Sequence, residues 1–147
     1  MAQVIYNRYK ARQSQVFWAG ASAPSGFTAL LLEATVSGAW DPDLNTVADL
    51  LAVSGVTEMS GGSYARQSLA SLTATEDDTN DRVNIDAANL TFGAVSGKSA
   101  LALVIFENGA SDAARNLVGY YDTGFGTLQT PMAGGLTVNI TDFLRNA

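Results

Sequence analysis

The chain has 147 residues and a mass of 15.3 kDa, which suits a single domain. It contains neither histidine nor cysteine, so the composition excludes Ser-His and Cys-His catalysis, His-ligated metals, disulfides and thiolate chemistry. Its 14 acidic and 8 basic residues give a net charge of −6, which disfavours binding to nucleic acid or to anionic membranes.

The chain is weakly charged for its size. Charged residues make up 15% of it and hydrophobic residues 47%, whereas a typical domain has about 25% charged residues. Because charges are depleted where subunits meet, this composition favours a surface partly covered by other subunits. The alternative is a β-rich monomer with a Ser/Thr surface. The longest apolar runs, 27–32 and 100–106, are too short to span a membrane, and no signal peptide is apparent, so we expect synthesis in the cytoplasm.

Residues 1–18 form a distinct N-terminal segment, which we interpret as an arm or a short helix preceding a single β-rich domain over 19–147. Three of the eight basic residues lie in this segment. We expect its apolar residues to dock it, while the basic residues reach an acidic patch on a neighbouring subunit. The alternative is a frayed terminus. The apolar residues are Val4, Ile5, Val16, Phe17 and Trp18, and the basic ones are Arg8, Lys10 and Arg12.

The following residues alternate between apolar runs and turns. Residues 27–34 predict a buried strand, and 46–53 a short helix capped by Asp43 or Asn45. Further short strands are predicted at 64–69, 72–75, 82–85, 90–92, 100–107, 117–121 and 136–140. This series predicts a mainly β fold, an antiparallel β-sandwich or barrel-like domain with one or two short helices. The expected core comprises Phe27, Leu30, Leu32, Leu101, Leu103, Ile105, Leu117, Val138 and Ile140.

Few residues suggest chemistry. The acidic loop 76–81 offers oxygen ligands for a cation, but its spacing does not match a calcium loop, so we favour a solvated loop with Arg82 as its counter-charge. Asp41 and Asp43 beside Trp40 fit a turn better than a glycosidase pair. The glycines at 61–62 lack the Lys-Ser/Thr of a phosphate loop. We therefore expect no enzyme activity, no catalytic residues, no metal and no cofactor.

From about Trp40 to Phe143 the order of motifs is similar to one known set of proteins. The motifs are Asp41-Pro42-Asp43, Ala48-Asp49-Leu50-Leu51-Ala52, Gly62-Ser63-Tyr64-Ala65-Arg66, Asp78-Thr79-Asn80-Asp81-Arg82-Val83-Asn84-Ile85-Asp86, Leu103-Val104-Ile105-Phe106-Glu107, Leu117-Val118-Gly119-Tyr120-Tyr121-Asp122 and Gly134-Gly135-Leu136-Thr137-Val138. This order resembles small virion structural proteins of tailed bacteriophages, and most of all their head decoration, or capsid cement, proteins. The N-terminal segment lies outside the resemblance.

The resemblance implies a β-rich, non-enzymatic protein that sits as a homo-oligomer on the outer capsid surface of the virion. There it would bind the major capsid protein and stabilise the shell against internal DNA pressure, without touching nucleic acid or membrane. Two alternatives stay open: a tail structural subunit (tube or fibre-associated), and a glycan-binding or hydrolytic β-domain. The candidate capsid or subunit contacts, inferred from the N-terminal segment itself, are Val4, Ile5, Arg8, Lys10, Arg12, Phe17 and Trp18.

Overall fold

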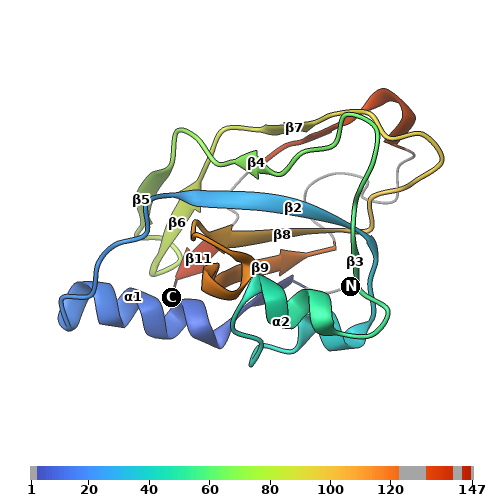
Figure 1. Cartoon of the computed structure of the whole chain (residues 1–147). Helices are drawn as coiled ribbons and strands as arrows, with labels where there is room; N and C mark the ends of the chain where they lie inside the picture. The colour runs from blue at the N-terminus through green and yellow to red at the C-terminus, as the bar shows by residue number, and fades with distance from the viewer. Residues whose placement is uncertain (1–2, 123–131, 141–143, 147) are drawn as a thin grey trace.

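The computed structural model describes residues 3–122, 132–140 and 144–146 (Figure 1). The helices are α1 (Asn7–Trp18) and α2 (Val47–Ala52), with short 3-10 helices η1 (Ser37–Trp40), η2 (Asp112–Ala114) and η3 (Met132–Gly134). The strands are β1 (Gln3–Ile5), β2 (Phe27–Ala34), β3 (Thr57–Glu58), β4 (Gln67–Ser68), β5 (Thr73–Asp77), β6 (Arg82–Asp86), β7 (Leu90–Phe92), β8 (Ala102–Glu107), β9 (Leu117–Tyr121), β10 (Leu136–Val138) and β11 (Leu144–Asn146). All of the strand pairings are antiparallel, so the prediction of a mainly β fold with short helices is confirmed.

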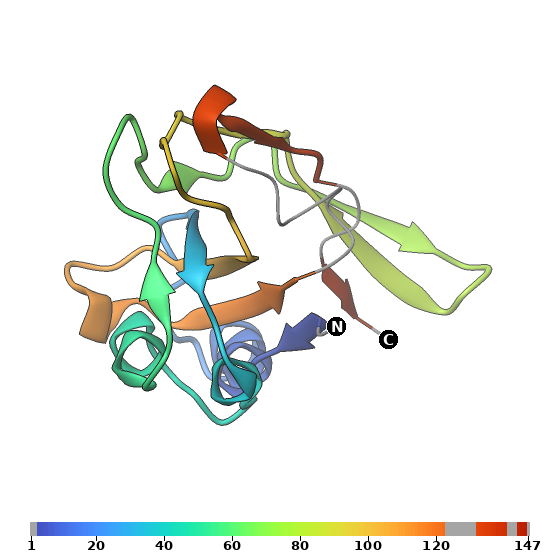
Figure 2. The same cartoon turned by 90° about the vertical axis from the view of Figure 1, so that its right-hand side faces the viewer.

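The largest sheet has the strand order β1-β9-β8-β2-β3, and β4 also pairs with β2. Its centre is the long pairing of β2 with β8, which runs from Phe27 opposite Glu107 to Leu32 opposite Ala102. Within the described residues this sheet does not close into a barrel, and β1 lies at one edge. Two smaller sheets, β10-β7 and β11-β6-β5, complete the fold, and the β5–β6 hairpin projects away from the body (Figure 2).

Both faces of the large sheet are buried, and each has its own hydrophobic core. Leu31, Leu103 and Ile105 belong to one core, together with residues of β7 and β10. Leu30, Leu32 and Val104 face the opposite way and pack with Val47 and Leu50 of α2. Because alternate side chains enter two cores, the central strands read as continuous apolar runs rather than as an alternating pattern.

Two local predictions need correction. Helix α2 is capped by Thr46 rather than by Asp43 or Asn45: the Thr46 hydroxyl accepts from Asp49 N at 3.2 Å, and Asp49 Oδ2 accepts from Thr46 N at 2.9 Å. This reciprocal capping box satisfies two backbone donors that no helical carbonyl can reach. The strand predicted over 64–69 shrinks to the two residues of β4, because Tyr64 and Arg66 turn their polar groups to Glu58.

The predicted core is mostly confirmed. Leu30, Leu32, Leu103, Ile105, Leu117, Val138 and Ile140 are buried. Phe27 and Leu101 are only half-buried, because each lies at the end of the β2–β8 pairing, where the sheet gives way to loops. Among the described residues, no helix is both long and apolar enough to cross a bilayer.

Candidate functional site

The N-terminal segment is built into the domain. Strand β1 pairs with β9, with Val4 opposite Tyr120 and Ile5 opposite Gly119, and both apolar side chains are half-buried. The next residue, Tyr6, is fully buried, and its hydroxyl donates to the Ala39 carbonyl at 2.7 Å. Helix α1 therefore starts from a fixed point at the edge of the large sheet.

The two arginines of α1 form hydrogen bonds with other residues of this chain. Arg12 Nε lies 3.3 Å from Glu107 Oε2, and its Nη2 donates to the Ser22 carbonyl at 3.0 Å. Arg8 Nε donates to Asn116 Oδ1 at 3.0 Å. Lys10 differs from both: it is exposed, and its one hydrogen bond within the described residues is a 3.5 Å contact with Asn7 on its own helix. Of the three basic candidates, Lys10 is thus the one whose charge faces solvent.

Phe17 and Trp18 do not dock the segment as the sequence led us to expect. Their side chains are 77% and 82% exposed, and the two rings meet edge to face with centroids 4.9 Å apart. For Trp18 the cause is helical geometry, because the buried residue of α1 is Tyr9, and Trp18 comes nine residues later, about 180° around the helix. Phe17 lies about 80° from Tyr9, in the last turn of the helix. Val16 is half-buried on the inner side. The pair therefore stands on the surface.

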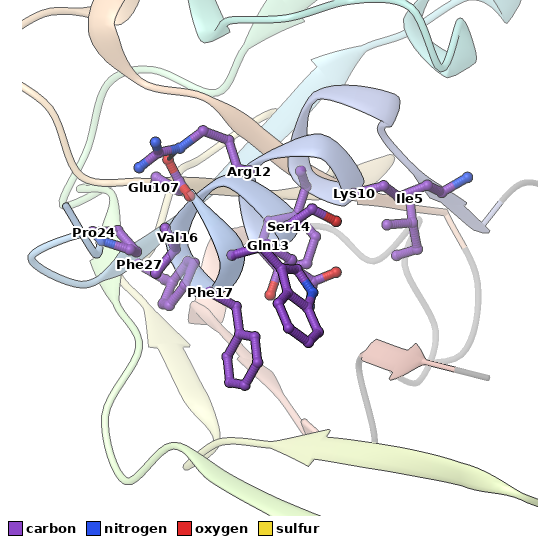
Figure 3. A pocket seen from close by; sticks show the side chains of 12 residues that line it. Ile5, Lys10, Arg12, Gln13, Ser14, Val16, Phe17, Pro24, Phe27 and Glu107 are labelled. Atoms are coloured by element: carbon purple, nitrogen blue, oxygen red, sulfur yellow. Dashed lines mark hydrogen bonds and ion pairs between the residues drawn. The ribbon is translucent and has the colours of Figure 1, made fainter. Parts of the chain in front are cut away.

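These rings border a concavity of about 740 Å³, which we call the α1 groove (Figure 3). Its lining residues are Ile5, Tyr9, Lys10, Arg12, Gln13, Ser14, Val16, Phe17, Trp18, Pro24, Phe27 and Glu107. A second cavity of about 180 Å³ shares Tyr9 and Phe27 with it and is bounded by Leu72, Ala74 and Ile85, among others. The groove thus extends from α1 toward the β5–β6 hairpin.

Two ionic groups of the α1 groove, Arg12 and Glu107, neutralise one another. The Glu107 carboxylate is 3% exposed and accepts from Arg12 and, at 2.7 Å, from Asn116 Nδ2. Burial, with a smaller effect of the Glu107 charge, raises the pKa of Tyr9 to about 12, so its hydroxyl is neutral at physiological pH. With Arg12 and Glu107 paired and the aromatic rings exposed, the groove is suited to a contact with another macromolecule.

A second polar cluster, which the sequence analysis missed, holds loops together. Arg66 donates to Glu58 (Nη2 to Oε2, 2.6 Å) and to Asp112 (Nη1 to Oδ1, 2.6 Å), and Arg115 pairs with the same Asp112. Both guanidinium groups lie over the Phe106 ring, 5.4 and 5.7 Å from its centroid. The hydrogen bond from Arg66 contributes most to lowering the pKa of Asp112 to about 2. Every charged group of this cluster is paired, which indicates a structural role.

The acidic loop is organised around one carboxylate. Asp77 accepts from Asn80, from Arg82 Nε at 2.9 Å and from Asn84, and these hydrogen bonds, that of Asn80 first, lower its pKa. Arg82 is thus the local counter-charge that the sequence predicts. Within the described part of the chain, no three Asp or Glu residues converge as a metal site would require. Asp41 accepts from the Asp43 amide, the turn contact expected of it.

Comparison with known proteins gives no relative for this chain. No protein-family model matches it, and neither a curated protein nor a solved structure matches it. The features of the chain that bear on its function are therefore the α1 groove and the resemblance of the sequence motifs.

Proposed function

We propose that this protein is a head decoration, or cement, protein of a tailed bacteriophage. It binds the outer capsid surface through the major capsid protein, stabilises the shell and catalyses no reaction. The observation that carries the proposal is the pair of exposed rings, Phe17 and Trp18, beside the α1 groove. Large aromatic side chains of this kind supply most of the binding energy in protein–protein contacts. The resemblance of the motifs to decoration proteins supplies the setting.

The contact that we propose for the N-terminal segment differs from the ionic contact expected from the sequence. Arg8 and Arg12 are engaged by Asn116 and Glu107, so apolar burial replaces charge as the main attraction. Covering an aromatic side chain contributes about 1.5–3 kcal/mol, whereas an exposed ion pair contributes about 0–1 kcal/mol. Each contact is weak, but a symmetric shell repeats it many times, so a modest contact can stabilise a particle.

The experiment adds purified protein to heads of the phage that lack it, then measures co-sedimentation and the temperature at which the heads release DNA. We compare the wild type with the variant Phe17→Ser/Trp18→Ser and with Val36→Ser as a matched control. Val36 is also exposed, but it lies outside the α1 groove. The proposal expects the wild type and the control to bind and protect heads, and the double variant to bind weakly. Wild-type protein that binds tails or glycans instead of heads would contradict the decoration role.

A further inference from the structure

We propose that the α1 groove is occupied by a second copy of this chain, with α1 of each copy lying across the groove of the other. In this arrangement the basic face of α1 meets the acidic β5–β6 hairpin of the partner copy. The inference rests on the proposed function only in treating the α1 surface as a contact: Phe17 and Trp18 pack between the two copies, and the shell binds the dimer rather than the rings of a single copy. Its test uses the isolated protein, so the dimer and the head binding can fail separately.

The first argument is apolar fit. One copy offers two exposed rings, Phe17 and Trp18. The groove that would receive them shares Tyr9 and Phe27 with the cavity beside the hairpin, where Ala74 lies opposite Ile85 in the strand register. At the end of this cavity Leu72 is 40% exposed, one of four large hydrophobic residues exposed in the described part of the chain. Both halves of an apolar contact are therefore present on one molecule.

The second argument is charge. Three basic residues and no acidic one precede Glu33 in the sequence. The segment 73–86, which forms the hairpin, contains five acidic residues and a single arginine. That arginine, Arg82, pairs with Asp77, while Glu76, Asp78 and Asp81 are exposed. Within one chain of net charge −6, the helix and the hairpin thus carry opposite signs, and opposite potentials favour and orient a contact.

The third argument is symmetry. A two-fold axis places α1 of the first copy on the hairpin of the second and, by the same operation, α1 of the second on the hairpin of the first. The exposed rings of each copy are then buried in the groove of the other, and the basic helix of each copy neutralises part of the other's acidic charge. An unrelated partner would need to carry both an acidic and an apolar surface of matching shape, whereas a second copy already has both.

Sedimentation equilibrium of the full chain in low and high salt provides the test. We expect a dimer, which Phe17→Ser/Trp18→Ser converts to a monomer while Val36→Ser does not. Lys10→Glu and Glu76→Lys should each weaken the dimer by about tenfold or more, because like charges then face each other. Because screening acts on exposed charges, high salt should weaken the wild-type dimer in part.

A mixing experiment tests the arrangement itself. In an equimolar mixture of Lys10→Glu and Glu76→Lys chains, a two-fold heterodimer has opposite charges at both contacts, so the mixture should dimerise about as tightly as the wild type. Dimers in the mixture no tighter than in either variant alone would overturn the helix-to-hairpin pairing. A wild-type chain that stays monomeric up to about 100 μM would overturn the dimer. If that monomer still bound heads through Phe17 and Trp18, the decoration role would stand with the shell as occupant.

Discussion

Arg12 and Glu107 are 95 residues apart in sequence, yet Arg12 Nε lies 3.3 Å from Glu107 Oε2. This contact joins the middle of α1 to the last residue of β8, and the carboxylate it covers is 3% exposed. Because Glu107 also accepts from Asn116, which in turn binds Arg8, the helix is held at two points. The N-terminal helix is thereby a fixed platform for the exposed rings at its end.

Arg12→Ala should destabilise the protein by about 2–4 kcal/mol. The substitution removes the cation beside the buried Glu107 carboxylate and leaves the neutral Asn116 amide as its side-chain donor. Urea denaturation monitored by tryptophan fluorescence measures the change. Gln15→Ala on the same helix is the control, and its exposed position outside the α1 groove predicts a change within about 0.5 kcal/mol. Equal effects of the two substitutions would show that the Arg12–Glu107 pair does not hold the helix.

Ile105→Ala should cost about 2–5 kcal/mol, because Ile105 is fully buried at the centre of β8 and its truncation leaves a cavity. Val36→Ala, at a site 38% exposed, serves as the matched control and should change the free energy of unfolding little. A cost near zero for Ile105→Ala would contradict the position of β8 in the core.

The chain has five tyrosines, and burial raises the pKa of each of them. The folded protein therefore binds phenolic protons more tightly than the unfolded chain, whose tyrosines titrate near 10. Stability from this source is complete below pH 10 and is lost as the pH rises above it. Absorbance at 295 nm should show no tyrosinate until the circular dichroism reports unfolding. Protein unfolded in guanidinium should titrate near pH 10, and native protein that did the same would refute the burial.

Asp112→Asn should lower stability at pH 7, because Arg66 and Arg115 then lose their anionic partner. The pKa of Asp112 is lowered from 3.8 to about 2, so its contribution is present above pH 4 and disappears as the pH falls through about 2. Urea unfolding of both proteins at several pH values measures the difference between them. That difference should shrink between pH 4 and pH 2. A difference independent of pH would show that Asp112 does not act through its charge.

The sequence predicted the central strands well, and the reason is physical. Residues 29–32 and 100–106 are apolar without interruption because both faces of the large sheet are covered, and Gly26 and Asn108 lie close to the ends of these strands. Helix α2 is also predicted from the sequence, but with Asp43 or Asn45 as its cap in place of Thr46. The Thr46–Asp49 spacing is that of a capping box and was a usable signal.

The contact surface was harder to predict. Phe17 and Trp18 are apolar, so their residue types favour burial. They are exposed because they lie at the end of α1, turned away from the side of the helix that buries Tyr9. The partners of Arg12 and Arg66 lie 95 and 46 residues away along the chain, beyond any local pattern. Sequence alone thus indicated a basic N-terminal anchor, whereas tertiary contacts bind Arg8 to Asn116, pair Arg12 with Glu107 and leave the rings at the surface.

Electron microscopy of the virion, with antibody or gold labelling of this chain, tests the central proposal most directly. The decoration role predicts label over the outer surface of the head at many regularly spaced positions, and loss of that label when Phe17 and Trp18 are both replaced by serine. Label confined to the tail, or none on the particle, would contradict it.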